Sequence, residues 1–287
     1  MSADFPVRFP APAKINRFLH ITGRRPDGYH ELQTVFQFVD LCDWLRFSPL
    51  PSGRVELGAP VPFVNGDNLC VKAAHLLAEH TGHPLGVRIA LTKSIPVGGG
   101  LGGGSSDAAT TLVALNHLFG LGLSLQALAQ LGLRLGADVP VFVQGHAAWA
   151  EGVGERLIPV EPDTPWVLLV DPGESVSTAT MFGSTELTRD CPPERITPSG
   201  YESLGNVFEP LVRRRLPAVD AALAWLEASG VPARLSGTGG CLFGLFGDEV
   251  SARAAQQAQP RPWRSWVGRL ANRSPLCEWH PRNADGA

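Results

Sequence analysis

The residues of this sequence best suited to chemistry on a phosphate form a glycine-rich run at residues 98–106, GGGLGGGSS. Glycine lets a backbone approach a ligand closely, and successive N–H groups can point into one concavity. The run leads into a segment expected to be helical from Asp107 to Phe119, and the start of a helix carries partial positive charge that favours an anion. Ser105 and Ser106 add hydroxyl groups for a phosphate or a magnesium ion.

Other interpretations of this run fit less well. Gly98, Gly100 and Gly103 match the G-x-G-x-x-G of a dinucleotide site. That site needs an acidic residue about 20 positions further on, at the end of a second strand, whereas residues 118–122 read LFGLG. A Walker A loop needs lysine where Ser105 stands. If the run were only a surface turn, its glycines would lose much backbone entropy on folding, and no bound ligand would offset that loss.

The composition of the chain narrows the class of protein. It has 287 residues and a net charge of −3, which gives no broad attraction to nucleic acid or to an anionic membrane. Its five cysteines are odd in number and scattered, without a C-x-x-C, which favours free thiols in the cytoplasm. No apolar run reaches the ~18 residues of a membrane helix, and the N-terminal segment lacks the apolar stretch of a secretory signal. We therefore expect a cytoplasmic protein that binds neither nucleic acid nor membranes.

Strands and helices are expected on both sides of the glycine run. In the first half we expect extended segments at 5–22 and 32–47, a helix at 67–80 capped by Asn65 or Asp67, a strand at 87–92, and a helix that Ser124 begins and a left-handed Gly136 closes. In the second half we expect strands at 166–170, 233–235 and 241–246, helices at 217–229 and 248–257, and a polar, disordered tail after Ser274.

Several segments together resemble the GHMP kinase superfamily. The glycine run, with Pro96 before it, resembles the phosphate loop of that superfamily, and SGTGGCLFGLF at 236–246 resembles its third motif. Three further segments resemble the 4-diphosphocytidyl-2-C-methyl-D-erythritol kinase family in particular: PAKINRFLHITGRRPDGYHELQTVFQFVDL at 12–41, LGADVPVFVQGHAAWAEGVGE at 135–155 and NRSPL at 272–276.

The resemblance implies an α/β (α+β) fold with two lobes and the active site between them. The N-terminal, ATP-binding lobe, residues 1–158, would be of the ribosomal-protein-S5-domain-2-like type, and the C-terminal lobe, residues 159–287, would be ferredoxin-like. The implied reaction transfers the γ-phosphate of ATP, with Mg²⁺, to the 2-hydroxyl of 4-diphosphocytidyl-2-C-methyl-D-erythritol, in the non-mevalonate route to isoprenoid precursors. The protein would be a monomer or a homodimer whose partner is a small-molecule substrate.

Residue roles follow from the resemblance, position by position. Asp138 matches the family's proposed catalytic base, and Lys14 matches the lysine near the substrate hydroxyl. The residues that match ATP contacts are Pro96, Gly98, Gly99, Gly100, Leu101, Gly102, Gly103, Gly104, Ser105, Ser106, Asn68 and Lys93. The residues that match substrate contacts are Asn16, Tyr29, His30, Thr178 and Phe182. Ordinary alternatives exist for three of these residues: a turn cap for Asp138, a solvated surface position for Lys14 and core packing for Phe182.

The resemblance leaves the metal ligands and two alternative functions open. Ser105 or Ser106 is a candidate magnesium ligand, and Asp107 could face magnesium or cap its helix. Gly237 and Gly239 are expected to let the third motif pack against the phosphate loop. The alternatives are another GHMP kinase, acting on a substrate such as homoserine or mevalonate, and a ligand sensor without catalytic activity on the same fold.

Overall fold

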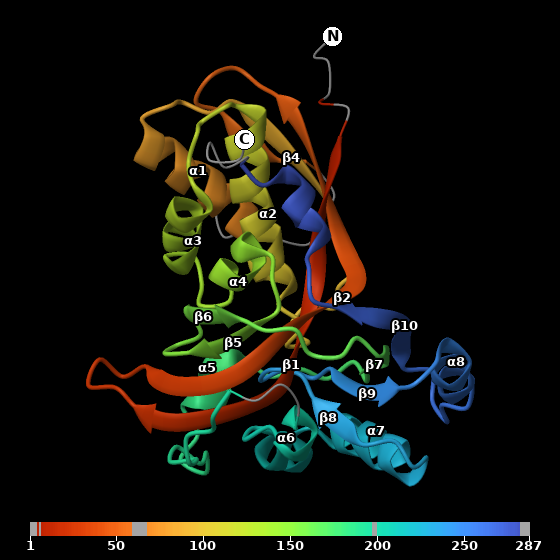
Figure 1. Ribbon diagram of the computed structural model, residues 1–287. Helices are drawn as coiled ribbons and strands as arrows, with labels where there is room; N and C mark the ends of the chain where they lie inside the picture. Colours follow the sequence, from red (N-terminus) through yellow and green to blue (C-terminus); the bar gives the residue numbers. More distant parts are fainter. Residues whose placement is uncertain (1–4, 6, 59–67, 197–199, 282–287) are drawn as a thin grey trace.

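The computed structural model describes residues 5, 7–58, 68–196 and 200–281, and it arranges them around a mixed sheet (Figure 1). The first half of the chain forms β1 (Arg8–Arg24), β2 (His30–Pro49), β3 (Val55–Leu57), α1 (Leu69–Thr81), β4 (Val87–Thr92), α2 (Gly103–Leu118), α3 (Leu125–Leu133), α4 (Val139–Gln144), β5 (Ala148–Glu151) and β6 (Arg156–Pro159). The second half forms β7 (Trp166–Asp171), α5 (Thr178–Phe182), the 3₁₀ turn η2 (Tyr201–Ser203), α6 (Glu209–Arg215), α7 (Pro217–Ala228), β8 (Ala233–Leu235), β9 (Leu242–Phe246), α8 (Glu249–Gln257), β10 (Arg264–Ala271) and η3 (Pro275–Trp279).

Two long strands, β1 and β2, run the length of the molecule and pair antiparallel (Figure 1). Strand β2 also pairs with β4, β5 and β10. Strand β10 pairs with β7 over residues 264–269 but with β2 only through Leu270 with Val39 and Ala271 with Phe38. A short stretch of β10 therefore joins the strands of the second half to those of the first.

The helices gather at the two ends of the sheet. Figure 1 shows α1 to α4 beside β2 and β4 at one end, and α6 to α8 around β8 and β9 at the other. Helix α7 buries Val219, Leu223 and Leu226, which recur at the spacing of one helix face. A hydrophobic core lies at each end. Phe9 of β1 packs in the core beside α1 to α4, the first core, and Ile21 of β1 packs in the core beside α6 to α8, the second core. The expected division of the chain at residue 158 stays a prediction.

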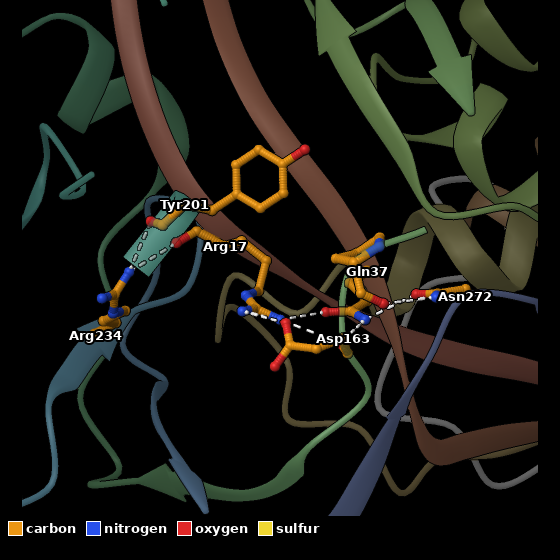
Figure 2. A network of polar contacts seen from close by, with 7 residues as sticks. Arg17, Gln37, Asp163, Tyr201, Arg234 and Asn272 are labelled. Atoms are coloured by element: carbon orange, nitrogen blue, oxygen red, sulfur yellow. Dashed lines mark hydrogen bonds and ion pairs between the residues drawn. The ribbon is translucent and has the colours of Figure 1, made fainter. Parts of the chain in front are cut away.

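A polar network fastens the junction of the two halves (Figure 2). Arg17 is buried in β1 and donates to Oε1 of Gln37 at 2.9 Å and to Oδ1 of Asp163 at 3.0 Å. Gln37 donates to Oδ1 of Asn272 at 2.8 Å, and Arg234 of β8 donates to the main-chain oxygen of Arg17 at 3.3 Å. These bonds hold β1 and β2 against the segment between β6 and β7 and against the C-terminal half.

Most of the expected elements are confirmed, and two helix boundaries differ. Helix α2 begins at Gly103 rather than at Asp107, because Gly102 takes a left-handed conformation (φ 73°) that ends the loop early. Helix α3 begins after Ser124, which accepts from the N–H of Ala127 as expected. It ends at Leu133, and Gly136 is not left-handed although its N–H bonds to the oxygen of Gly132.

Two other expectations concern segments at the edge of the described residues. The caps expected at Asn65 and Asp67 lie outside those residues, and Asn68 caps α1 by accepting from the N–H of Cys70 at 2.8 Å. The part of the tail at 275–281, which was expected to be disordered, is ordered, because η3 inserts Leu276 into the first core. Among the described helices, none is long and apolar enough to cross a membrane.

Replacing Leu276 by alanine should lower the free energy of unfolding by about 2–5 kcal/mol, the usual cost of removing a buried leucine side chain. The side chain is fully buried, so the change leaves a cavity beneath β1. Urea unfolding measures this, with Leu133→Ala as the matched control because Leu133 is 39% exposed. Equal losses of unfolding free energy in the two variants would show that the tail does not contribute to the stability of the core.

Candidate active site

A cleft of about 600 Å³ is lined by the glycine run and by Gly237 and Thr238 of the third motif. Nearly all the residues expected to bind ATP line it, together with three of those expected to bind substrate and the expected catalytic pair. These residues are Asn68, Lys93, Pro96, Gly98, Gly99, Gly100, Leu101, Gly102, Gly103, Gly104, Ser105, Asn16, Thr178, Phe182, Lys14 and Asp138. Residues from distant parts of the chain therefore meet in one hollow of a size that suits a small-molecule ligand.

The glycine run is held against the third motif by contacts that leave no room for side chains. A Cβ added to Gly100 would lie 2.0 Å from the main-chain oxygen of Ser236, and one added to Gly239 would lie 2.3 Å from the nitrogen of Gly100. Ser236 Oγ also donates to the oxygen of Gly100 at 3.1 Å. The third motif thus packs on the glycine run, as expected for Gly239.

The start of α2 faces the cleft without a capping side chain. Gly102 is its N-cap, and the first-turn N–H groups of such a helix have no partner within the helix. They are suited to hold a phosphate. Ser105 lines the cleft, whereas Ser106 does not because its side chain is fully buried, and its Oγ has no hydrogen-bond partner among the described residues. Of the two serines considered for phosphate or metal, only Ser105 reaches the cleft.

Lys14 and Asp138 form an ion pair at the edge of this cleft. Lys14 Nζ lies 3.3 Å from Oδ2 of Asp138, and the lysine side chain is 3% exposed against 33% for the aspartate. The ammonium also donates to Oδ1 of Asn16 at 2.6 Å and to the oxygen of Gly100 at 3.0 Å. Its three N–H groups therefore have three acceptors, which fixes its position. Asp138 stands at the start of α4, where its side chain makes no capping hydrogen bond.

Lys93 is held between two acidic residues rather than projecting freely into the cleft. Its ammonium forms ion pairs with Asp43 and, at 2.7 Å, with Asp107. Asp43 is fully buried and accepts from the N–H of Ser94 and of Ile95. Burial raises the pKa of Asp107 to about 7, with Lys93 opposing the rise and Asp43 adding to it. Within the described residues there is no group of three or more acidic, histidine or cysteine side chains placed to hold a metal.

Asp107→Asn should gain stability relative to the wild type as the pH rises from about 4 to about 7. The carboxyl ionises at its ordinary value of 3.8 in the unfolded chain and at about 7 in the folded protein. The stability that protonated Asp107 contributes at low pH is therefore lost as the pH rises through this window. The difference is at most about 4 kcal/mol, at about 1.4 kcal/mol per pKa unit. Urea unfolding of both proteins at several pH values measures it, and a wild-type advantage that grows with pH would contradict the assignment.

A second pocket of about 520 Å³ adjoins the cleft, since Leu32, Thr178 and Phe182 line both. Tyr29 and His30 line it, and Tyr29 is 64% exposed. The ring of Phe182 lies 5.1 Å from that of His30. Phe182 also packs against the second core, so the alternative of core packing holds in part. All five residues expected to bind substrate therefore line one or other of two adjoining pockets.

The protonation of His30 follows from its surroundings. Burial lowers the pKa of His30, and the charges of Arg189 and Arg24 lower it further. Arg189 Nε donates to Nε2 of His30 at 2.9 Å. The neutral ring therefore carries its proton on Nδ1 and can donate from there. Sequence reasoning did not find Arg189, nor Asp43 beneath Lys93, because each acts on a residue far away along the chain and lies in no recognised motif.

Comparison with known families and proteins gives consistent matches. The family model for the N-terminal domain of GHMP kinases matches residues 68–146, and that for their C-terminal domain matches residues 196–264. A 4-diphosphocytidyl-2-C-methyl-D-erythritol kinase of Nitrosococcus oceani is 53% identical over 271 residues, which cover 94% of this chain and 96% of the relative. The kinase of the same name from Chromohalobacter salexigens is 52% identical over 294 residues, with 98% of each chain covered.

Solved structures give the same result for the fold. A crystal structure of 4-(cytidine 5'-diphospho)-2C-methyl-D-erythritol kinase superposes with a TM-score of 0.81 at 36% identity, covering 92% of this chain and 99% of the other. A homoserine kinase of Cytophaga hutchinsonii superposes with a TM-score of 0.67 at 15% identity, covering 93% and 95% of the two chains. The second likeness concerns the fold alone.

Proposed function

The chain belongs to the 4-diphosphocytidyl-2-C-methyl-D-erythritol kinase family of the GHMP kinases, and on that premise we propose how its two adjoining pockets carry out the reaction. The protein transfers the γ-phosphate of ATP to the 2-hydroxyl of 4-diphosphocytidyl-2-C-methyl-D-erythritol, which yields the 2-phosphate and ADP. The observation that carries the proposal is the Lys14–Asp138 pair, which lines the same cleft as the glycine run, next to the pocket of Tyr29 and His30.

Asp138 acts as the general base. Its carboxylate accepts the proton of the substrate hydroxyl as the oxygen attacks the γ-phosphorus and the bond to the ADP oxygen breaks. Lys14 orients the carboxylate and stabilises the negative charge that develops on the transferred phosphoryl group. The ammonium can do this without moving far because Asn16 and Gly100 already hold it. The protein contributes mainly positioning and electrostatics.

The phosphates of ATP bind at the glycine run, where main-chain N–H groups and the start of α2 supply donors. Magnesium, when bound, would neutralise charge on the phosphates, since this ion is usually held by substrate phosphates with one or two protein groups. The Ser105 hydroxyl and the Asp107 carboxylate are oxygen donors that line the cleft, so the residues present fit such an ion. Asn68 and Lys93 line the side of the cleft that we assign to the adenosine.

The cytidine moiety binds in the second pocket. Tyr29 offers an exposed ring face and Phe182 a second aromatic surface. The Nδ1–H of neutral His30 donates to an acceptor on the cytosine edge, while Arg189 holds the other ring nitrogen. Neither homoserine nor mevalonate carries a base that could use these groups.

We further propose that the protein works in the cytoplasm as a monomer or homodimer.

Release of ADP by the purified protein tests this function. With magnesium and ATP, we expect turnover with 4-diphosphocytidyl-2-C-methyl-D-erythritol and none with homoserine or mevalonate. Turnover with one of the controls alone would keep the phosphate chemistry and remove the roles given to Tyr29 and His30. Binding of the cytidylated compound without any ADP release would favour a ligand sensor.

Asp138→Asn should lower kcat on the order of 10²–10⁴-fold, the usual contribution of a general base. The amide keeps the shape of the side chain but cannot take the proton, whereas ATP binding at the glycine run should change little. Steady-state kinetics and nucleotide titration measure the two effects. Asp220→Asn serves as the control because Asp220 lies on α7, away from the cleft lining. Undiminished kcat in Asp138→Asn would remove the base assignment.

A further inference from the structure

The side chain that orients the catalytic lysine is itself oriented by a buried hydroxyl on the neighbouring strand. Asn16 of β1 is 3% exposed and Thr34 of β2 is fully buried. Asn16 Nδ2 donates to Thr34 Oγ1 at 2.9 Å, and Thr34 Oγ1 donates to the main-chain oxygen of Phe18. A chain of hydrogen bonds therefore runs from the backbone of β1 through Thr34 and Asn16 to the ammonium of Lys14.

The hydrogen bonds between Phe18, Thr34, Asn16 and Lys14 can be donated in only one direction, because the number of hydrogens on each group is fixed. A hydroxyl has one hydrogen, and that of Thr34 is given to the oxygen of Phe18. Thr34 can then only accept from Asn16, so the NH₂ of the amide must face Thr34. The oxygen of the amide is left to face Lys14, whose ammonium has no lone pair and can only donate. Both ends of the chain thus require the same orientation of Asn16.

An irregularity in the sheet supplies the acceptor that starts this chain. Asn16 pairs with Phe36 and Leu19 with Thr34, so that Arg17 and Phe18 together oppose one residue of β2. Such a β-bulge locally disrupts the ladder of backbone hydrogen bonds, and here the Phe18 oxygen accepts a side-chain hydroxyl. On the other side of the bulge, Arg17 is anchored by Gln37 and Asp163 (Figure 2). The bulge is therefore held from both sides.

From this geometry we propose that Thr34 is a positioning residue for phosphoryl transfer, which sets the Asn16 amide so that its oxygen holds Lys14 against Asp138. Thr34 is absent from the linings of both pockets, so it acts only through Asn16. Without the hydroxyl, the buried NH₂ of Asn16 loses its acceptor, and the side chain turns away to reach another one. The amide oxygen then no longer holds the ammonium of Lys14 against Asp138. The proposal rests on the function assigned above to that pair.

Kinetics of Thr34 variants test the proposal. Thr34→Val keeps the shape of the side chain and removes the hydroxyl, so kcat should fall on the order of 10- to 100-fold, as expected when a buried donor loses its acceptor. The KM for ATP should not change, because the nucleotide binds at the glycine run. Thr34→Ser restores the hydroxyl and should restore kcat. Equal losses in the serine and valine variants would overturn the proposal, since the methyl group would then be what matters.

Thr110→Val is the matched control. Thr110 is also fully buried, and its Oγ1 also donates to a main-chain oxygen of β1, that of Pro10, at 3.0 Å. It lines neither pocket. A purely structural role for buried threonines would make the two valine variants alike in both melting temperature and kcat. We expect similar losses of melting temperature and a loss of kcat in Thr34→Val alone; a kcat loss in both would overturn the proposal.

A crystal structure of Thr34→Val tests the positioning itself, independently of any substrate. Lys14 Nζ should lie beyond ion-pair distance of Asp138, compared with 3.3 Å in the wild type. An unchanged pair would overturn the proposal even if the enzyme acts on the expected substrate. Conversely, a wild-type protein without turnover would refute the assigned function and leave this structural measurement decisive. If the valine variant does not fold, Thr34→Ala removes the same hydroxyl and gives the same test.

Discussion

The buried ammonium of Lys14 is the constraint on which the arrangement of the site depends. A charge with 3% exposure is costly unless its donors are paired, and this ammonium takes one acceptor from each of three places: Asn16 of its own strand, Gly100 of the glycine run, and Asp138 before α4. All three segments must be in place for the charge to be satisfied. The Lys14–Asp138 pair therefore forms only when β1, the glycine run and the start of α4 have come together.

The contact between the two glycine loops, residues 98–106 and the third motif at 236–246, is the second constraint on the site. Their backbones approach so closely that a side chain on Gly100 or Gly239 would collide with the opposite loop. The glycines lose much conformational entropy on folding, but their lack of side chains allows this close contact between the two loops. Because Ser236 bonds to the same Gly100 oxygen as Lys14, the C-terminal half also helps to position the lysine.

The motifs and the regular elements could be predicted from the sequence, whereas many side-chain partners could not. Strand 87–92 and helix 217–229 follow from strong local periodicity, and the glycine run follows from its composition. The pairing of Lys93 with Asp43 depends on residues 50 positions apart, and Arg189 reaches His30 across 159 positions. No local pattern encodes such contacts. The burial of Ser106 was likewise invisible, since it depends on α2 beginning at Gly103, earlier than its apolar pattern indicates.

The most direct test of whether Asp138 is the general base is a crystal structure of the protein with a non-hydrolysable ATP analogue and 4-diphosphocytidyl-2-C-methyl-D-erythritol. We expect the triphosphate along residues 98–106, the cytosine beside His30, and the 2-hydroxyl within about 3.2 Å of a carboxylate oxygen of Asp138, the reach of a general base. A 2-hydroxyl held well away from Asp138, with the γ-phosphate beside another acidic residue, would contradict this role of Asp138.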